Sequence, residues 1–174
     1  MAMLLSGGML FDGDGQVHEG MGVLVDGDRI ARVAPVAEFA NFDGQRVDTS
    51  GGTLLPGLFD CHVHLCMTAS GDTGADMAKM SDATITMLAL QNAQTILRGG
   101  VTSVRDCGGK DYLEFAVRDA INARKFMGPT IHAVGKMICM TGGHGNRVGR
   151  IADGVQEVVK AVREQVHAGC DCVK

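Results

Sequence analysis

Apolar and polar positions follow two different patterns along the chain. Residues 1–55 contain short segments in which apolar and polar residues alternate, interrupted by Gly and Asp. In one of them, residues 22–34 (GVLVDGDRIARVA), two apolar runs flank Asp26-Gly27, a pair suited to a tight hairpin turn. The pattern predicts a small β-sandwich-like module over residues 1–55, which is too short to bury much of a core alone.

After Pro56, strand-like apolar runs alternate with helical patterns, which is typical of a parallel sheet built from βα units. Strands are predicted at residues 57–65 (GLFDCHVHL), 101–106 (VTSVRD) and 130–137 (TIHAVGKM), and a fourth is predicted to begin within residues 170–174 (CDCVK).

Three amphipathic helices are predicted between these strands. Their apolar residues recur every three or four positions, as expected for one buried helix face. The predicted helices cover residues 81–98, with Ser81 or Asp82 as N-cap, residues 113–121, and a third segment from near Asp153 to Gly169.

Four such units amount to half of an eight-stranded barrel, whose usual length is about 250 residues. We therefore expect an α/β protein in which residues 56–174 form about the first half of a (β/α)8 TIM-type barrel. A half barrel leaves apolar strand edges open, so the remainder of the barrel, from the same or a second chain, is an expected partner. An open doubly wound sheet is the structural alternative.

The composition is that of a globular protein, with 45% hydrophobic residues and a net charge of −4 in 174 residues. Lys and Arg are scattered singly, which disfavours nucleic-acid binding. No positively charged leader opens the chain, and no apolar run approaches the roughly 18 residues of a membrane span. We expect a cytoplasmic protein that binds neither nucleic acid nor membranes, with its six cysteines reduced and buried.

Two histidines in the first predicted strand carry the clearest chemical signal. Residues i and i+2 of a strand point to the same face, so His62 and His64 project together, and Asp60 joins them. Two imidazoles held on one strand can supply half of a divalent-metal site. Two partly exposed histidines without a ligand would give the same pattern, but barrel active sites form at the C-terminal ends of strands.

At this point the sequence resembles a known family. Residues 54–65, LLPGLFDCHVHL, resemble the first-strand signature of the amidohydrolase superfamily, and that superfamily places a Gly/Asp-rich β module before its barrel. The similarity continues through GGVTSVRDCGG (99–109), MTGGHG (140–145) and AGCDCVK (168–174). The RDCGG and TGGHG elements resemble most the imidazolonepropionase and Xaa-Pro dipeptidase branch.

The resemblance implies a metal centre. His62 and His64 would ligate the more buried ion, and Lys174 matches a lysine that is carboxylated to bridge two metals. An ammonium has no lone pair to offer, whereas a carbamate supplies two anionic oxygens. One or two zinc ions are implied, with iron, manganese or nickel as alternatives. The family's remaining ligands and general base would follow later strands, and an ordinary surface lysine is the alternative for Lys174.

The glycine-rich segment TGGHGNR supplies the candidate substrate-binding residues. The resemblance assigns His144 to catalysis, as the group that polarises the substrate carbonyl, and Gly143 lets the backbone approach the substrate closely. Arg147 or Arg150 could bind a substrate carboxylate. Exposed loop residues without a role are the alternative.

Arg105 and Asp106 end the second predicted strand. We expect them to form a structural ion pair, and orientation of the metal-binding histidines is the alternative.

The predicted function is that of a metal-dependent amidohydrolase that cleaves a C–N bond with metal-activated water. A dipeptidase or carboxypeptidase acting on dipeptides or N-acyl amino acids, assembled as a homo-oligomer, is favoured. A cyclic amide hydrolase or deaminase of the imidazolonepropionase type is an alternative with the same chemistry. A non-catalytic relative, and an open-sheet protein that binds metal without turnover, are alternatives of other classes.

Overall fold

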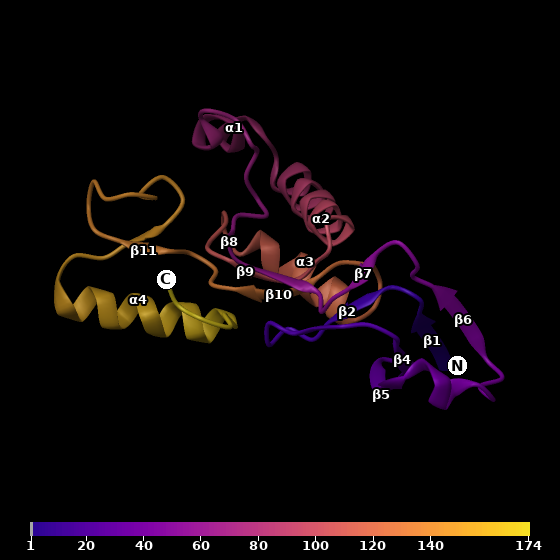
Figure 1. The fold of residues 1–174 in the computed structure, drawn as a ribbon. Coiled ribbons are helices and arrows are strands. Elements are labelled where there is room, and N and C mark those ends of the chain that lie inside the picture. The colour runs from indigo at the N-terminus through magenta and orange to yellow at the C-terminus, as the bar shows by residue number, and fades with distance from the viewer. Residues whose placement is uncertain (1) are drawn as a thin grey trace. The chain divides into compact units, whose positions relative to one another are not determined.

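The computed structural model describes residues 2–174, which divide into two compact units (Figure 1). The first unit ends at Pro56 and the second begins at Gly57. None of the helices within residues 2–174 has the length and apolar character needed to cross a membrane.

The first unit is built from two small sheets. Its four-stranded sheet has the order β5–β4–β1–β6, and its three-stranded sheet the order β3–β2–β7. The strands are β1 (Ala2–Ser6), β2 (Met9–Phe11), β3 (Val17–His18), β4 (Met21–Asp26), β5 (Arg29–Pro35), β6 (Gln45–Asp48) and β7 (Thr53–Leu54), with a 3-10 helix, η1 (Val36–Phe39), after β5.

The predicted hairpin around Asp26-Gly27 is confirmed. Strands β4 and β5 are antiparallel, and Gly27 adopts a φ of 61°, which a glycine takes without steric cost. Leu4, Ala34 and Phe39 form the buried core of this unit. A packed cluster of three buried side chains is small, in line with the shortness of the segment, and a sandwich-like arrangement of the two sheets stays a prediction.

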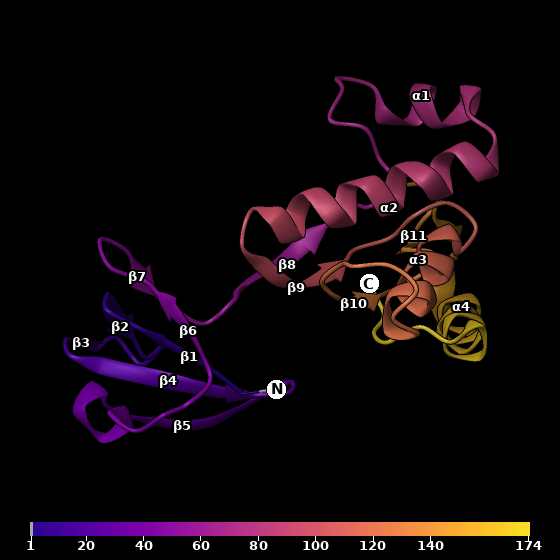
Figure 2. The same ribbon diagram turned by 90° about the vertical axis from the view of Figure 1, so that its right-hand side faces the viewer.

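The second unit contains a three-stranded parallel sheet and four helices (Figure 2). The strand order is β10–β9–β8, with β8 at Leu58–Val63, β9 at Val101–Asp106 and β10 at Thr130–Ala133. The helices are α1 (Thr73–Lys79), α2 (Asp82–Arg98), α3 (Leu113–Asn122) and α4 (Gly154–Ala168), and a short parallel pair joins β11 (Ile138–Cys139) to β12 (Arg150–Ile151).

The core of this unit lies where α2 and α3 pack against the sheet. Helix α2 contributes buried Ile85, Ala89 and Ala93, and the strands contribute Val104 and Ile131. Small side chains on α2 let the helix approach the sheet closely. The other residues of each strand point to the opposite face, where the candidate site begins.

The predicted helices are confirmed, together with two of their end signals. The Ser81 side chain caps α2 by accepting a hydrogen bond from Thr84 N, and Gly169 ends α4 with a φ of 94°. Helix α1, capped by Asp72, was not predicted, because its seven residues are too few to show a helical period.

The strand predictions are confirmed for β9 and, with the shorter bounds Leu58–Val63, for β8, but the expected fourth strand is wrong. Residues 170–174 form no strand, with a bend at residues 171 and 172, although Asp171 N donates to Ala133 O and Ile138 N donates to Lys174 O. The physical reason lies in the Asp171 carboxylate, which accepts the Ala133 N–H that a neighbouring strand would otherwise bind. Strand β10 ends at Ala133, earlier than predicted, and Gly135 beyond it adopts a φ of 75°.

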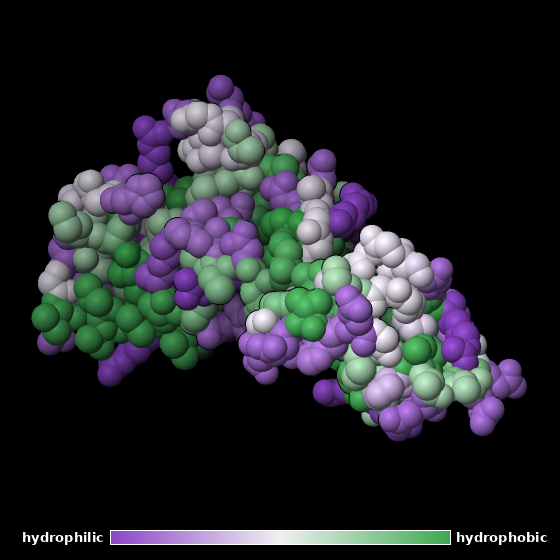
Figure 3. Space-filling view, viewed as in Figure 1, coloured by the Kyte–Doolittle hydropathy of each residue, from purple (hydrophilic) through white to green (hydrophobic). Residues whose placement is uncertain are grey.

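Helix α4 carries exposed apolar side chains, and Figure 3 shows them gathered at its end of the unit. Val155 and Val166 are 76% and 62% exposed. The order of strands and helices is that of consecutive βα units, and closure into a full barrel stays a prediction.

Candidate active site

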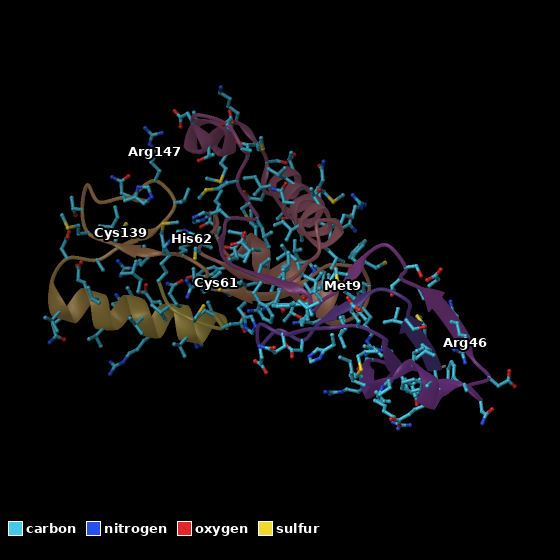
Figure 4. All side chains as sticks on the ribbon, in the orientation of Figure 1. Met9, Arg46, Cys61, His62, Cys139 and Arg147 are labelled. Atoms are coloured by element: carbon cyan, nitrogen blue, oxygen red, sulfur yellow. The ribbon has the colours of Figure 1, made fainter. Side chains whose placement is uncertain are left out.

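The candidate metal ligands meet at the carboxyl end of β8. His62 lies on β8, where Figure 4 labels it, and His64 follows the strand by one residue. Their ring centroids are 5.4 Å apart. Lys174 Nζ lies 3.1 Å from His62 Nε2, so all three predicted ligand residues are gathered at one place.

His62 is held in position by its own strand, and its surroundings lower its pKa. Its backbone N–H donates to Asp60 Oδ1 at 2.9 Å. The ammonium of Lys174 is the main cause that lowers the pKa of His62, followed by partial desolvation and the neighbouring His64. A lowered pKa favours the neutral imidazole, which is the form that binds metals.

His64 is oriented by a backbone carbonyl. Its Nδ1 lies 2.7 Å from Gly108 O. Because a carbonyl oxygen only accepts hydrogen bonds, the proton of a neutral His64 lies on Nδ1 and the Nε2 lone pair is free. This is the tautomer of a metal-ligating histidine whose other nitrogen donates to a backbone carbonyl.

Asp106 and Arg105 have separate partners, in place of the ion pair expected between them. Asp106 is fully buried and accepts hydrogen bonds from Leu65 N at 2.7 Å and Gly108 N at 2.8 Å. Burial raises the pKa of Asp106, and the two N–H donors oppose that shift. Arg105 Nε donates to Cys61 O at 2.8 Å.

These residues fit part of a ligand set for a divalent ion. His64 directs Nδ1 at a carbonyl oxygen and leaves the Nε2 lone pair without a proton, the pKa of His62 is lowered, and Lys174 Nζ lies 3.1 Å from His62 Nε2. Within residues 2–174, no three His, Cys, Asp or Glu side chains form a metal-binding group, so the fit concerns two histidines together with Lys174.

The glycine-rich loop forms part of the wall of an open cavity of about 530 Å³ that His64 also lines. Gly143, His144 and Arg147, which were predicted to bind substrate, all line it. The rest of the wall includes three thioether side chains, namely Met67, Met77 and Met137. The cavity therefore combines imidazole and guanidinium groups with an apolar, polarisable wall.

The two candidate arginines differ in their surroundings. Arg147 lines the cavity, is 70% exposed and lies 3.3 Å from Asp72 at the start of α1 (Figure 4). Arg150 pairs with Glu164 at 2.7 Å and is not among the residues that line this cavity. Arg147 is thus the better placed of the two to meet a substrate carboxylate.

Sequence reasoning missed Asn92, which supports the segment after His64. Its Nδ2 donates to Leu65 O at 2.9 Å and to Met67 O at 3.1 Å. Asn92 follows buried Ile85 and Ala89 on the inner side of α2. A polar residue on an otherwise apolar helix face was the signal that could have found it.

A buried carboxyl group, Glu114, lies beneath the loop that carries Gly108. Its side chain is fully buried, its Oε2 is 3.8 Å from Cys66 Sγ, and its Oε1 has no hydrogen-bond partner among the described residues. Burial, reinforced by the charge of Asp106, raises the pKa of Glu114 to about 8. Burial likewise raises the pKa of the Cys66 thiol.

The cysteines are free in the described residues, but their burial differs from the prediction. Cys66 and Cys107 are buried, Cys139, Cys170 and Cys172 are half-buried, and Cys61 is exposed. The prediction is wrong for Cys61 because β8 is exposed along its length up to His62, on both of its faces.

Known proteins are similar to this chain in sequence and in fold. The model of the amidohydrolase family matches residues 53–174. The chain is 27% identical over 200 residues to ochratoxinase from Aspergillus niger, covering 98% of this chain and 41% of that protein. It is 31% identical over 181 residues to imidazolonepropionase from Micrococcus luteus, covering 91% of this chain and 44% of that protein.

A solved structure of a Xaa-Pro dipeptidase with methionine bound in its active site superposes with a TM-score of 0.86 and 29% identity. The superposition covers 99% of this chain and 46% of the dipeptidase chain. This chain therefore spans less than half the length of each of these three relatives. Because the family model matches well over half of the residues, the chain belongs to the amidohydrolase family.

Proposed function

We propose that the protein is a metal-dependent amidohydrolase that cleaves a C–N amide bond. The observation that carries this proposal is the 3.1 Å approach of Lys174 Nζ to His62 Nε2, beside a His64 whose tautomer is fixed. Residues 112 positions apart meet at the carboxyl end of the first parallel strand, where barrel enzymes build their active sites.

We propose zinc as the ion, held by His62 and His64, with Lys174 as its carbamate. Neutral imidazoles suit this metal, and a carbamate converts a repelling cation into an anionic oxygen donor. When bound, the ion supplies an activated water as nucleophile and a Lewis acid for the carbonyl oxygen.

The protein side chains bind and polarise the substrate. His144 donates a hydrogen bond to the carbonyl oxygen as negative charge develops there. The positive φ values of Gly142 and Gly145, 69° and 84°, fold the loop so that His144 lines the same cavity as His64. The methionine wall covers the apolar part of the substrate and excludes water around the reacting bond.

A dipeptide or N-acyl amino acid is the proposed substrate. The cavity of about 530 Å³ is large enough for a small molecule of this kind. Arg147 would bind its free carboxylate, while the thioethers contact an apolar side chain. The likeness to a Xaa-Pro dipeptidase structure supports this substrate class.

Hydrolysis of a cyclic amide is the second candidate. The 31% identity to an imidazolonepropionase over 91% of this chain favours it. The two candidates share the histidines and Lys174, and they differ in whether the cavity receives a linear chain with a free carboxylate beside the scissile bond.

The test uses the complete natural protein, purified and analysed for bound metal. We expect zinc or another divalent ion, hydrolysis of dipeptides, and uptake of isotopically labelled bicarbonate as a carbamate carbon signal. His62→Ala and His64→Ala should lose both metal and activity, whereas His167→Ala, at the exposed end of α4, serves as the matched control.

Three outcomes would change the proposal, each at a different point. Metal-free protein whose activity survives both histidine substitutions would contradict the proposal. Activity on imidazolonepropionate without activity on dipeptides would favour the second candidate. A carbamate signal that persists in Lys174→Ala would exclude Lys174 as its source.

A further inference from the structure

Asp106 joins two backbone segments that both determine the position of His64. One carboxylate oxygen, Oδ2, accepts from the N–H of Leu65, the residue that follows His64. The other, Oδ1, accepts from the N–H of Gly108, whose own carbonyl oxygen receives the His64 ring. A single side chain thus fixes both the backbone of the histidine and the acceptor of its ring proton.

The surroundings of Asp106 leave it little freedom. The side chain is fully buried, and both of its oxygens are engaged at hydrogen-bond lengths of 2.7 and 2.8 Å. The backbone on either side is also tied down, because Cys107 N donates to Val63 O at 2.7 Å and Val134 N donates to Asp106 O at 3.2 Å. Gly108 adopts a φ of 121°, a backbone conformation that residues other than glycine rarely adopt.

We propose that Asp106 is a positioning residue that sets the ring tautomer of His64 through the carbonyl of Gly108. Only a carboxylate accepts two N–H donors there without offering a proton of its own. An asparagine would direct its NH₂ group at one of the two N–H donors and release either Leu65 or Gly108. The His64 ring would then lose its fixed acceptor, and its proton would distribute over both nitrogens.

The direct test is nitrogen NMR of the His64 ring in the metal-free complete protein, with signals assigned by their loss in His64→Gln. We expect the wild-type protein to show one tautomer, protonated on Nδ1, and Asp106→Asn to show both. Asp12→Asn is the matched control, because Asp12 Oδ1 also accepts from two backbone N–H groups, those of Asp14 and Gln16, in the first unit. This control should leave the His64 signals unchanged.

The role of Asp106 at a metal site rests on the proposed function, and a second measurement keeps the two apart. Titration with Co²⁺ alone should show affinity reduced by about 10- to 100-fold in Asp106→Asn, as is typical for an outer partner of a ligating histidine. Wild-type protein that binds no Co²⁺ would contradict the proposed function while leaving the tautomer result to stand.

Three results would overturn the inference about Asp106. One is a folded Asp106→Asn protein that keeps a single Nδ1-protonated tautomer and its Co²⁺ affinity. Another is a change of tautomer in Asp12→Asn as well. The third result comes from the wild-type protein and does not depend on whether a variant folds. A His64 ring protonated on Nε2 would contradict the role assigned to Asp106.

Discussion

Lys174 Nζ approaches His62 Nε2 to 3.1 Å, although 112 residues separate the two in the sequence. The contact brings together a histidine on β8 and a lysine whose backbone carbonyl is bound by Ile138 N. The lysine cation therefore acts directly on the pKa of the histidine.

Removing the Lys174 cation should raise the pKa of His62. In the metal-free protein the ammonium is the main cause of the lowered value, so Lys174→Ala should return the His62 pKa towards its usual range. Proton NMR of the imidazole against pH measures this. Lys125→Ala, an exposed lysine after α3, is the control and should leave the His62 titration unchanged.

In the metal-loaded protein, Lys174→Ala should also lower activity. The loss should exceed the roughly 10- to 100-fold seen when a residue that hydrogen-bonds to a metal ligand is removed, because Lys174 itself is the proposed ligand. A variant with unchanged kcat and metal content would contradict the ligand role of Lys174.

Glu114 should make the protein less stable as pH rises through the neutral range. The folded protein holds the proton of this buried carboxyl with a pKa of about 8, whereas the unfolded chain releases it near 4.5, the ordinary pKa of a glutamic acid. The native state thus binds more protons than the unfolded chain between these two pH values. The contribution of Glu114 to stability is therefore full below about pH 4.5 and is lost up to about pH 8, by the order of a few kcal/mol.

Urea unfolding across this range measures the slope for Glu114. Glu114→Gln should flatten the decline, because the amide carries no titrating proton, and the exposed Glu19→Gln should keep it. An unchanged slope in Glu114→Gln would show that the carboxyl does not hold a raised pKa.

The parts of the fold that follow local rules were predictable from the sequence. Helical periodicity and a serine N-cap placed α2, and period-two alternation predicted that His62 and His64 lie close together, as their ring-centroid distance of 5.4 Å shows. These signals depend only on residues close in sequence, so they can be recognised without knowledge of the tertiary structure.

The support of the site was not predictable, for physical reasons that differ between residues. The acceptor of His64 is a backbone carbonyl, Gly108 O, and every residue type has one, so no sequence pattern marks it. Asp106 is next to Arg105 in the sequence, which suggested an ion pair, yet alternation along β9 sends the two side chains to opposite faces. Asn92 was visible as a polar residue on an apolar face, but its partners lie in a segment 25 and 27 residues away.

Two glycines of the 140–149 loop should tolerate alanine very differently. Both adopt positive φ, 69° at Gly142 and 84° at Gly145, so each substitution costs about 1 to 2 kcal/mol in backbone strain. A methyl group on Gly142 meets no atom within 4 Å, whereas one on Gly145 would overlap Met137 Sδ. Gly145→Ala should therefore lose a further 1 to 3 kcal/mol, roughly, and displace His144.

Thermal unfolding and steady-state kinetics of the two glycine variants give the comparison, with Gly142→Ala as the matched control. We expect kcat/KM to fall more in Gly145→Ala than in Gly142→Ala. Equal losses would show that backbone strain alone, and not the contact with Met137, sets the loop position.

Arg147 should select substrates that end in a free carboxylate. Its ion pair with Asp72 is exposed, with side chains 70% and 63% accessible, so its loss should cost little stability, within about 1 kcal/mol. Arg147→Ala should raise KM for dipeptides while leaving KM for the corresponding C-terminal amides nearly unchanged, because only the former present a carboxylate to the guanidinium. Arg150→Ala is the control, since Arg150 binds Glu164 and does not line the cavity; it should change KM for neither substrate. Equal KM values for acids and amides in the wild-type enzyme would remove Arg147 from substrate recognition and leave the methionine wall and His144 as the groups that select the substrate.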